Sequence, residues 1–552
     1  MAIDEFRAVA TSNEAAISIR IAAAERWAAC ELAAGNVTAA VSPLILAVGL
    51  LPRAARPSLT RADREQPLAL FAGLASTGAA VALASGQENA ALRLLEHGRG
   101  VLLRQALDAR GDLTALREAH PDLAAELERL RDRLDPAPGA AGTAPVPADP
   151  PSVAAAGSDA QQRHALADRW NAVVAEIRKR PGFENFFQPP GLAELFARCA
   201  AGPVVIVNVS ELRCDALILR TGGMSVVPLA GLTLKEATAR AEAFRADVLA
   251  AWRPGAAADR VAATLGWLWD AVAGPVLDAI GFGPVIDGGP PPRVWWVPTG
   301  PLAFLPLHAA GQHDETGDAA GRNVFDRAVS SYLPTAASLP APREAGAAAT
   351  TDTAAPGVLV VAMPSTPSER DLECAQDEAD DIAGRLAGVD VLTGSEATRA
   401  AVLAALPAHP WAHFACHAAS SADDASAARL LLTDHEDHPL TVREIAGLRI
   451  PRAELAYLSA CDTARGPVQL ADEAVHITGA FHMAGYAHVI GTLWSVDDEI
   501  AAEVARDVYA RLAAPGPDAA RAALALHHAV RKVRERQPGL PALWAAHVHV
   551  GP

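Results

Sequence analysis

The sequence predicts an α/β protein in which a mostly parallel sheet flanked by helices is preceded by an all-α helical-repeat region. Three observations support this architecture. Residues 1–134 place apolar side chains at helical spacing, and the Pro/Gly/Ala-rich stretch after Leu134 cannot build a core. From residue 203 onward, short apolar runs alternate with helical segments. Strands as apolar as these are typical of a parallel sheet covered on both faces.

Composition limits the class of protein. The 552 residues are several times the roughly 150 of an ordinary domain, so at least two domains are expected. A hydrophobic share of 51% with 20% charged residues is typical of a soluble, folded chain. With 47 Lys and Arg against 64 Asp and Glu, the net charge is −17, which disfavours nucleic acid and anionic lipid as partners.

The cysteines and the first residues predict where the protein works. The chain has 6 cysteines and no C-x-x-C pair, which argues against a disulfide scaffold or a zinc ribbon and favours a reducing compartment. Acidic residues stand near the start, where a signal peptide would carry a basic segment and an apolar run. We therefore expect a cytoplasmic protein. The longest uncharged stretch, residues 68–86, is interpreted as a buried helix, with a membrane span as the alternative.

Two helix pairs are expected within residues 1–134, where each reads as helix, Gly-polar turn, helix. Their turns lie at Gly35–Asn36 and Gly86–Gln87, which are 86 − 35 = 51 residues apart. Tetratricopeptide repeats have a period of about 34 residues, so the match is loose. We expect at most two degenerate repeats, followed by a further helix that ends at Leu134.

The rest of the chain divides into a linker and a sheet module. Residues 135–160 are interpreted as the linker, 161–345 as a helical lead-in with the first half of the module, and 346–552 as the second, catalytic half. Two Gly/Ala-rich segments, 311–323 and 343–357, are expected to be surface loops. The predicted strands are 203–210, 215–220, 225–231, 293–298, 357–364, 411–418, 453–461 and 487–494.

Two predicted strands end in residues that can carry chemistry. His417 follows the apolar run WAHFAC, and Cys461 follows ELAYLSA. The carboxyl ends of parallel strands share one edge of a sheet, and the 461 − 417 = 44 residues between them leave room for a crossover helix within LTVREIAGLRI. An imidazole that faces a thiol can accept its proton during attack on an acyl carbon. Either residue alone would more often be part of the core, so the hypothesis depends on the pair.

A set of ordered motifs accompanies these two residues and resembles the CHAT peptidase family, whose relatives include caspases and separase. The resemblance is strongest over residues 265–550 and implies a caspase-like sheet and a cysteine endopeptidase. The segment LLEHGRGVLLRQALDARGD is similar to the helix that links repeats and peptidase in such proteins. The motifs are WWVPTGPLAFLPLHAAG, SSYLPT, WAHFACHA, ARLLLTDHEDHPLTVREIAGLRI, LAYLSACDTARG and ADEAVHITGAFHMAGYAHVIGTLWSVDDEIA.

The resemblance implies a role for individual residues. His417 would be the catalytic histidine and Cys461 the nucleophile, with an oxyanion hole formed by the backbone N–H groups of Ala418 and Cys461. The family usually has Gly where this chain has Ala418. Acidic residues near the nucleophile favour a substrate with a basic residue before the cut. Two of them, Asp497 and Asp498, are also typical of a helix start. These pocket candidates are Asp462, Asp472, Glu473, Asp497 and Asp498.

No cofactor and no metal site are predicted. A zinc site formed by His413, Cys416, His417 and Cys461 is disfavoured, because strand alternation sends His413 to the face opposite Cys416. A nucleotide switch lacks support, because the chain contains no G-x-x-x-x-G-K-[ST] loop.

The sequence therefore predicts a cytoplasmic cysteine endopeptidase that cleaves a protein substrate and is latent until a partner binds its N-terminal helices. No nucleic-acid or membrane partner is expected. The alternative is a catalytically silent scaffold or interaction protein, and the helices may instead only localise or stabilise the enzyme.

Overall fold

The computed structural model describes residues 2–55, 61–134, 165–166, 168–184, 186–285, 289, 291–313, 321–341, 357–419, 428–450, 452–460 and 477–552. The side chains of residues 61–63, 106–112 and 114 are outside this description. The expected linker, residues 135–160, also lies outside the described residues, so the division into domains stays a prediction.

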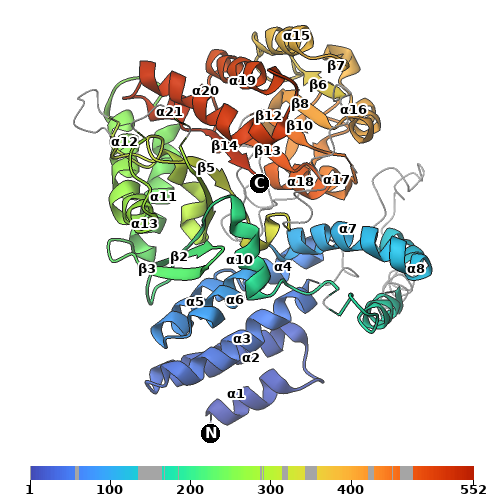
Figure 1. The fold of residues 1–552 in the computed structure, drawn as a ribbon, viewed down its shortest axis with the longest axis vertical. Coiled ribbons are helices and arrows are strands. Elements are labelled where there is room, and N and C mark those ends of the chain that lie inside the picture. The colour runs from blue at the N-terminus through green and yellow to red at the C-terminus, as the bar shows by residue number, and fades with distance from the viewer. Residues whose placement is uncertain are drawn as a thin grey trace.

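Helices form one end of the molecule and a sheet covered by helices forms the other (Figure 1). This confirms the predicted order of an all-α region followed by an α/β module. The first helices are α1 (Ala2–Thr11), α2 (Ile17–Ala33), α3 (Val37–Ala54), α4 (Arg61–Leu70), α5 (Leu74–Ala84), α6 (Glu88–Gly98), α7 (Val101–Ala119) and α8 (Pro121–Leu134).

The two predicted turns are equivalent. Gly35 after α2 and Gly86 after α5 have φ angles of +79° and +75°, a conformation that glycine adopts without steric strain. The following residue in each turn donates its N–H to a carbonyl five residues back, Asn36 to Glu31 and Gln87 to Ala82, as in a Schellman motif. The helices α2 and α3 pack as one hairpin, and α5 and α6 as the other. Their assignment to tetratricopeptide repeats stays a prediction.

Most of the uncharged stretch of residues 68–86 is buried, although Leu70 is exposed, and the expectation of one helix is wrong. A turn at 71–73 separates α4 from α5, and the two helices are bent by 41°. Small residues of α5 allow this turn and bring α6 close, so that a Cβ at Gly78 would lie 3.3 Å from the side chain of Leu94. By length and composition, α3 is apolar enough to cross a membrane, as is the bent pair of α4 and α5, and 50% of the α3 window is buried.

A small separate core lies beside the main body. It joins α7 and α8 to a helix at residues 168–177 (Figure 1). Leu116, Leu127 and Ile177 are at its centre, and the rings of Trp170 and Phe187 stack with centroids 5.9 Å apart. The chain on both sides of the expected linker therefore packs into one unit.

The second part contains a sheet of 11 strands in the order β3-β2-β1-β4-β5-β14-β13-β12-β8-β6-β7. Most neighbours are parallel, as predicted, while β1–β2, β2–β3 and β13–β14 are antiparallel. The short strands β5, β7 and β14 lie where no strand is predicted, because each contains polar residues. The strands are β1 (Val204–Asn208), β2 (Asp215–Arg220), β3 (Gly223–Pro228), β4 (Arg293–Pro298), β5 (Val329–Tyr332), β6 (Val358–Ala362), β7 (Val389–Thr393), β8 (Trp411–Ala415), β12 (Leu455–Ser459), β13 (His488–Thr492) and β14 (His547–Val550).

Helices cover both faces of this sheet. The N-terminal helices share a core with one face, together with α10 (Leu192–Arg198), α16 (Arg399–Ala405), α17 (Val442–Gly447) and α18 (Ile477–Ala484). The other face carries α11 (Leu234–Val248), α12 (Ala256–Leu268), α13 (Gly274–Ile280), α15 (Ala375–Arg385), α19 (Asp498–Ala513), α20 (Ala522–Arg536) and α21 (Pro541–Trp544).

The predicted strand 411–418 is two strands, because the chain bends at Cys416. After the bend, β9 (His417–Ala419) joins β10 (Arg429–Leu431) and β11 (Leu440–Thr441) in a small antiparallel sheet. The predicted crossover helix is confirmed as α17, which begins with a capping box between Thr441 and Glu444.

Buried polar contacts attach the N-terminal helices to the sheet. The carboxylate of Glu96, at the end of α6, accepts hydrogen bonds from the N–H groups of Ala336 (2.9 Å) and Ala337 (3.0 Å). The Arg99 guanidinium donates to the Pro298 carbonyl (2.6 Å), and the Asn208 amide donates to the Ser76 carbonyl (3.1 Å). Because unpaired buried partners destabilise a protein, these contacts fix the helices on the sheet module.

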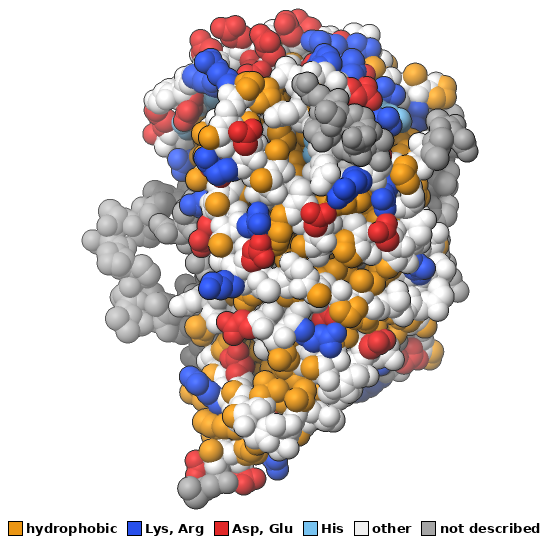
Figure 2. Space-filling model, turned by 90° about the vertical axis from the view of Figure 1, so that its left-hand side faces the viewer, with side chains coloured by type: hydrophobic (Ala, Val, Ile, Leu, Met, Phe, Trp, Pro, Cys, Tyr) orange, Lys and Arg blue, Asp and Glu red, His pale blue; other side chains and the backbone are white. Residues whose placement is uncertain are grey.

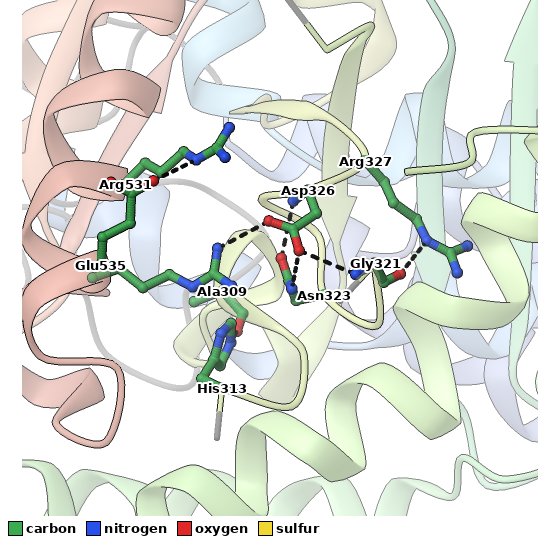
Figure 3. A network of polar contacts seen from close by, with 9 residues as sticks. Ala309, His313, Gly321, Asn323, Asp326, Arg327, Arg531 and Glu535 are labelled. Atoms are coloured by element: carbon green, nitrogen blue, oxygen red, sulfur yellow. Dashed lines mark hydrogen bonds and ion pairs between the residues drawn. The ribbon is translucent and has the colours of Figure 1, made fainter. Parts of the chain in front are cut away.

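A second polar network ties the segment before β5 to α20 (Figure 3). Asp326 accepts hydrogen bonds from the Gly321 N–H, the Asn323 amide (2.7 Å) and the Arg534 guanidinium (3.2 Å). Burial alone would raise the pKa of Asp326, but Arg534 and these donors hold it below its usual range. The prediction that residues 311–323 form a surface loop is wrong for the two ends of the segment, because Gly311 and Asn323 are buried and form a β-bridge.

Charged side chains of both signs are interspersed on the face displayed in Figure 2.

Candidate active site

His417 lies where β8 gives way to β9, at the carboxyl edge of the large sheet. Its ring is half-buried, and Nε2 is 2.7 Å from the carbonyl oxygen of Arg370. A carbonyl only accepts, so Nε2 donates this hydrogen bond and, in the neutral ring, Nδ1 carries the lone pair. The side chain is therefore oriented as a base with its acceptor nitrogen available.

The neighbouring strand β12 leads toward Cys461. β8 and β12 are parallel, with His413 opposite Tyr457 and Ala415 opposite Ser459. Cys461 itself lies outside the described residues, as do Asp462, Asp472 and Glu473. The last described residues before Cys461 are Ser459 and Ala460, and both line the same pocket as His417.

This pocket contains about 470 Å³ of empty space, part of which is open to solvent, and lies between β8, β12 and β13 on one side and α15 and α19 on the other. Two carboxylates contribute to its wall, Glu378 from α15 and Asp498 from α19. The polar residues that line it are Arg370, Glu378, His417, Ser459, Thr492, Asp498 and His547.

Glu378 connects the strands beneath the pocket. Its Oε2 is 2.9 Å from Nε2 of His413, and its Oε1 accepts a hydrogen bond from the Ser459 hydroxyl at 3.0 Å. His413 is fully buried, with its ring 5.1 Å from that of Tyr457 and 5.5 Å from that of Tyr509. Burial, with Glu378 nearby, raises the pKa of both phenols, so they stay protonated. One carboxylate thus holds β8 and β12 in register, four residues before His417 and two residues before Cys461.

A hydrogen bond from β13 holds the residue just before Cys461. The Thr492 hydroxyl donates to the carbonyl of Ala460 at 2.7 Å, and both groups are buried. The chain is therefore fixed immediately before the predicted nucleophile.

The acids after β13 have different positions. Asp497 caps α19, accepting from the N–H groups of Glu499 and Ile500, so the structure supports the helix-start interpretation for it. Asp498 lines the pocket and accepts the Cys374 N–H at 2.9 Å. Of the five predicted pocket acids, Asp498 is the one that the described part of the chain brings to His417.

Ala418 has an extended backbone in β9 with a negative φ. A side-chain methyl is compatible with this conformation, so the departure from the usual glycine introduces no backbone strain. Its N–H belongs to the residue next to His417, as the oxyanion-hole prediction requires.

Other described cysteines differ from a nucleophile. Burial, followed by the charge of Asp498, raises the pKa of Cys374 to about 11, and burial raises that of Cys199 to about 11 and that of Cys214 above its usual value. These thiols are therefore protonated at neutral pH. Cys416 is buried in the core on the opposite face of the sheet from His413, as strand alternation predicts.

No group of three His, Cys, Asp or Glu side chains is placed to hold a metal ion within the part of the chain that the structure describes. In the imagined zinc cluster, His413 instead pairs with Glu378.

Sequence reasoning missed Glu378, the Arg370 carbonyl and His547. Glu378 is part of an acidic segment whose sequence predicts a solvent-exposed helix. His547 follows the last helix, in a segment of mostly apolar residues. No local signal in the sequence distinguishes them, because their place at the pocket depends on the order of the strands.

Comparison with known proteins places the chain. The CHAT domain model matches residues 262–552, more than half of the chain. No curated protein sequence matches. Two structures of the Saccharomyces cerevisiae separase–securin complex are similar over 97% of this chain, at 9% and 10% identity with TM-scores of 0.45 and 0.44, and the chain spans 50% and 49% of theirs. The complex of Porphyromonas gingivalis RgpB pro- and mature domains is similar over 35% of this chain and 47% of its own, at 12% identity with a TM-score of 0.26.

Proposed function

Because the chain belongs to the CHAT domain family, a caspase-like peptidase family, we propose that it is a cysteine endopeptidase that cleaves a protein substrate with His417 and Cys461. The observation that carries the proposal is the placement of His417. Its Nε2 is tied to the Arg370 carbonyl while its Nδ1 is left as the base, beside the strand that leads to Cys461.

In the proposed reaction, Nδ1 of His417 accepts the proton of the Cys461 thiol as the sulfur attacks the carbonyl carbon of the substrate. The backbone N–H groups of Ala418 and Cys461 stabilise the oxyanion. His417 then donates its proton to the leaving amine, and water hydrolyses the acyl-enzyme. The Arg370 carbonyl stabilises the imidazolium that forms between these steps.

The proposed specificity is for a basic residue before the cut. Asp498 and Glu378 in the pocket wall support it, because partly buried carboxylates bind guanidinium or ammonium groups well. Asp462, Asp472 and Glu473 remain further candidates for the same pocket.

We also propose that a partner protein activates the cytoplasmic enzyme through its N-terminal helices. Helix α7 packs on α18, the helix that begins at Ile477 after the segment that contains Cys461. Asp132 of α8 forms an ion pair of 3.1 Å with Arg449 between α17 and α18. These contacts give a physical route from the helical region to the nucleophile.

The alternative function is a catalytically silent scaffold. It would need neither a histidine whose Nδ1 is the acceptor nor acidic residues in the pocket beside it, so the described geometry favours the enzyme.

Cleavage-site mapping in a proteome treated with wild-type protein or with Cys461→Ala tests the proposal. We expect new N-termini with the wild type alone and preferential labelling of Cys461 by a thiol-alkylating probe. Equal cleavage by both proteins contradicts the assignment, and no cleavage by either, with labelling elsewhere, favours the scaffold.

Activation through the helices has a separate test in the full chain. Glu96→Gln weakens the two hydrogen bonds that dock α6, whereas Glu88→Gln changes an exposed carboxylate of the same helix. If the docked helices restrain the site, the first variant alone shows raised activity without a partner. Equal activities contradict the restraint and leave the peptidase assignment standing.

A further inference from the structure

His547 lies on the floor of the pocket, on the last strand of the sheet. On β14 it is opposite Thr492 of β13. The register of β13 with β12, in which Ile490 is opposite Tyr457, continues to place Thr492 beside Ser459. Ser459 is opposite Ala415 of β8. Four neighbouring strands therefore contribute one row of side chains to the same face, one step below His417.

Within the described chain, His547 differs from the other polar residues of this row because its ring has no partner. Its side chain is buried, with an exposure of 2%, and neither Nδ1 nor Nε2 has a hydrogen-bond partner. In contrast, Ser459 donates to Glu378 and Thr492 donates to Ala460. A buried polar group without a partner destabilises the folded state, so the imidazole offers a hydrogen-bonding site that the fold itself does not use.

His547 also separates two cavities. It lines the pocket that contains His417, and it lines a second, partly open pocket whose wall includes His308, Phe325 and His527. The ring is thus the partition that limits the depth of the pocket. Its chemistry and its size both act on whatever side chain enters.

The chemistry of the surroundings selects one class of side chain. Burial lowers the pKa of His547 to about 4, so the ring is neutral at physiological pH and one nitrogen is an acceptor. The carboxylates of Glu378 and Asp498 in the same pocket repel an acidic side chain. A side chain that carries N–H donors satisfies both the carboxylates and the imidazole.

We propose that His547 is a specificity-determining residue, which accepts a hydrogen bond from the N–H donors of the substrate side chain before the cut and closes the floor of its pocket. This inference rests on the proposed peptidase function and adds to it a residue outside the motifs that carry the family resemblance. It explains why an unpaired imidazole is kept in a position where an apolar ring would pack without loss.

The test compares three variants of the full chain on a fluorogenic peptide library that varies the residue before the cut. His547→Phe fills the site without an acceptor, and His547→Gln keeps a donor and an acceptor. His527→Phe is the matched control, because His527 is buried with an unpaired Nε2 and lines the second pocket but not the one that contains His417. Reactions run with and without cell lysate, and the Cys461→Ala rate is subtracted.

For peptides with Arg or Lys before the cut, we expect kcat/KM to fall about 10- to 100-fold in His547→Phe, relative to peptides with Leu there. His547→Gln should recover most of this preference, and His527→Phe should follow the wild type. The Tm of His547→Phe should equal or exceed that of the wild type, because an unpaired buried polar group is removed.

Three results would overturn the inference. One is an identical preference in the wild type and in both His547 variants. Another is a His547→Phe variant that loses the same activity on every peptide and also has a lowered Tm, which would indicate a structural role. Both leave the peptidase assignment intact. A wild type that cleaves no peptide in the library, with or without lysate, contradicts the proposed function as well.

Discussion

One histidine at the edge of the large sheet and four near its centre differ in their access to water. His417 is half-buried at the carboxyl edge, and its ring is oriented by a single backbone carbonyl. His308, His488, His527 and His549 lie around β5, β13 and β14, and all are buried. Burial lowers the pKa of His308, His488 and His527 to about 3, and that of His549 well below its usual value. The same residue type is thus half-buried at the edge and a buried, neutral ring in the centre.

Three of these four central histidines, His308, His488 and His549, hydrogen-bond to each other or to nearby polar groups. His308 lies between the Tyr332 hydroxyl (2.9 Å) and the Ala545 carbonyl (3.1 Å). His549 is 2.8 Å from the Ser331 hydroxyl and 3.1 Å from His488. These contacts use the neutral rings, and the lowered pKa values of His308 and His549 disfavour proton uptake near neutral pH. The comparison teaches that solvent access, more than residue type, separates the two roles.

The largest expected effect is at the edge. Cys461→Ala or His417→Ala should lower kcat/KM by at least about 1,000-fold, because nucleophile and base act in the same step. The Tm should change little, since His417 contributes little to core packing. Cys374→Ala is the matched control. Cys374 is half-buried and its thiol is protonated, so this variant should keep wild-type activity. Full activity in Cys461→Ala would remove the distinction between the two histidine groups.

The next effect concerns Glu378, which lies between the edge and the core. Glu378→Leu leaves the buried His413 and Ser459 without their shared partner, so we expect a loss of about 3–5 kcal/mol in the free energy of unfolding. Glu378→Gln can still accept from Ser459 and donate to His413, so its loss should be smaller. Urea denaturation measures both. Equal stability of the two variants would show that the network does not hold β8 and β12 together.

Acid should destabilise the centre. A histidine with a lowered folded-state pKa is protonated in the unfolded chain at a higher pH than in the folded protein. Its contribution to the free energy of unfolding is therefore complete above about pH 6.5 and is lost as the pH falls toward its folded-state pKa. At pH 5 each such histidine should lower the free energy of unfolding by about 2 kcal/mol. The difference between pH 7.5 and pH 5 should therefore be about 2 kcal/mol smaller in His527→Phe than in the wild type. His438→Gln, at an exposed histidine, should behave as the wild type does, and the same pH dependence in all three proteins would contradict the assignment.

The smallest expected effect is on specificity. Asp498→Asn removes one of the two carboxylates in the pocket wall and should reduce the preference for Arg over Leu before the cut by about tenfold. Asp497→Asn is the matched control. Asp497 is next to Asp498 but caps α19, and Asn is also a good cap. A larger effect from Asp497→Asn than from Asp498→Asn would place the substrate on the other side of the helix start.

Local chemistry predicts much of this protein. The apolar runs VVIVN and LAYLS form strands, Gly35 and Gly86 end their helices, and Thr441 with Glu444 starts α17. The sequence also predicted His417 at a strand end, and the structure places it there. Each of these depends on residues within a few positions of each other, so the signal is readable along the chain.

Other features depend on contacts far apart in sequence. The short strands β5 and β14 contain polar residues, and they form strands because β4 and β13 offer them unpaired backbone groups. Residues 68–86 are bent, because α3 and α6 pack against α5 and the small side chains of this stretch permit a turn.

By itself, then, the sequence determined most of the longer elements, the helical region before the sheet, and the edge where His417 lies. Only the tertiary structure decided that Glu378 of α15 joins β8 to β12 and that His547, near the end of the chain, lies on the pocket floor. The physical reason is that strand order is a non-local property. Which side chains share one face at one level of a sheet is set by the register between strands, and no local pattern encodes that register.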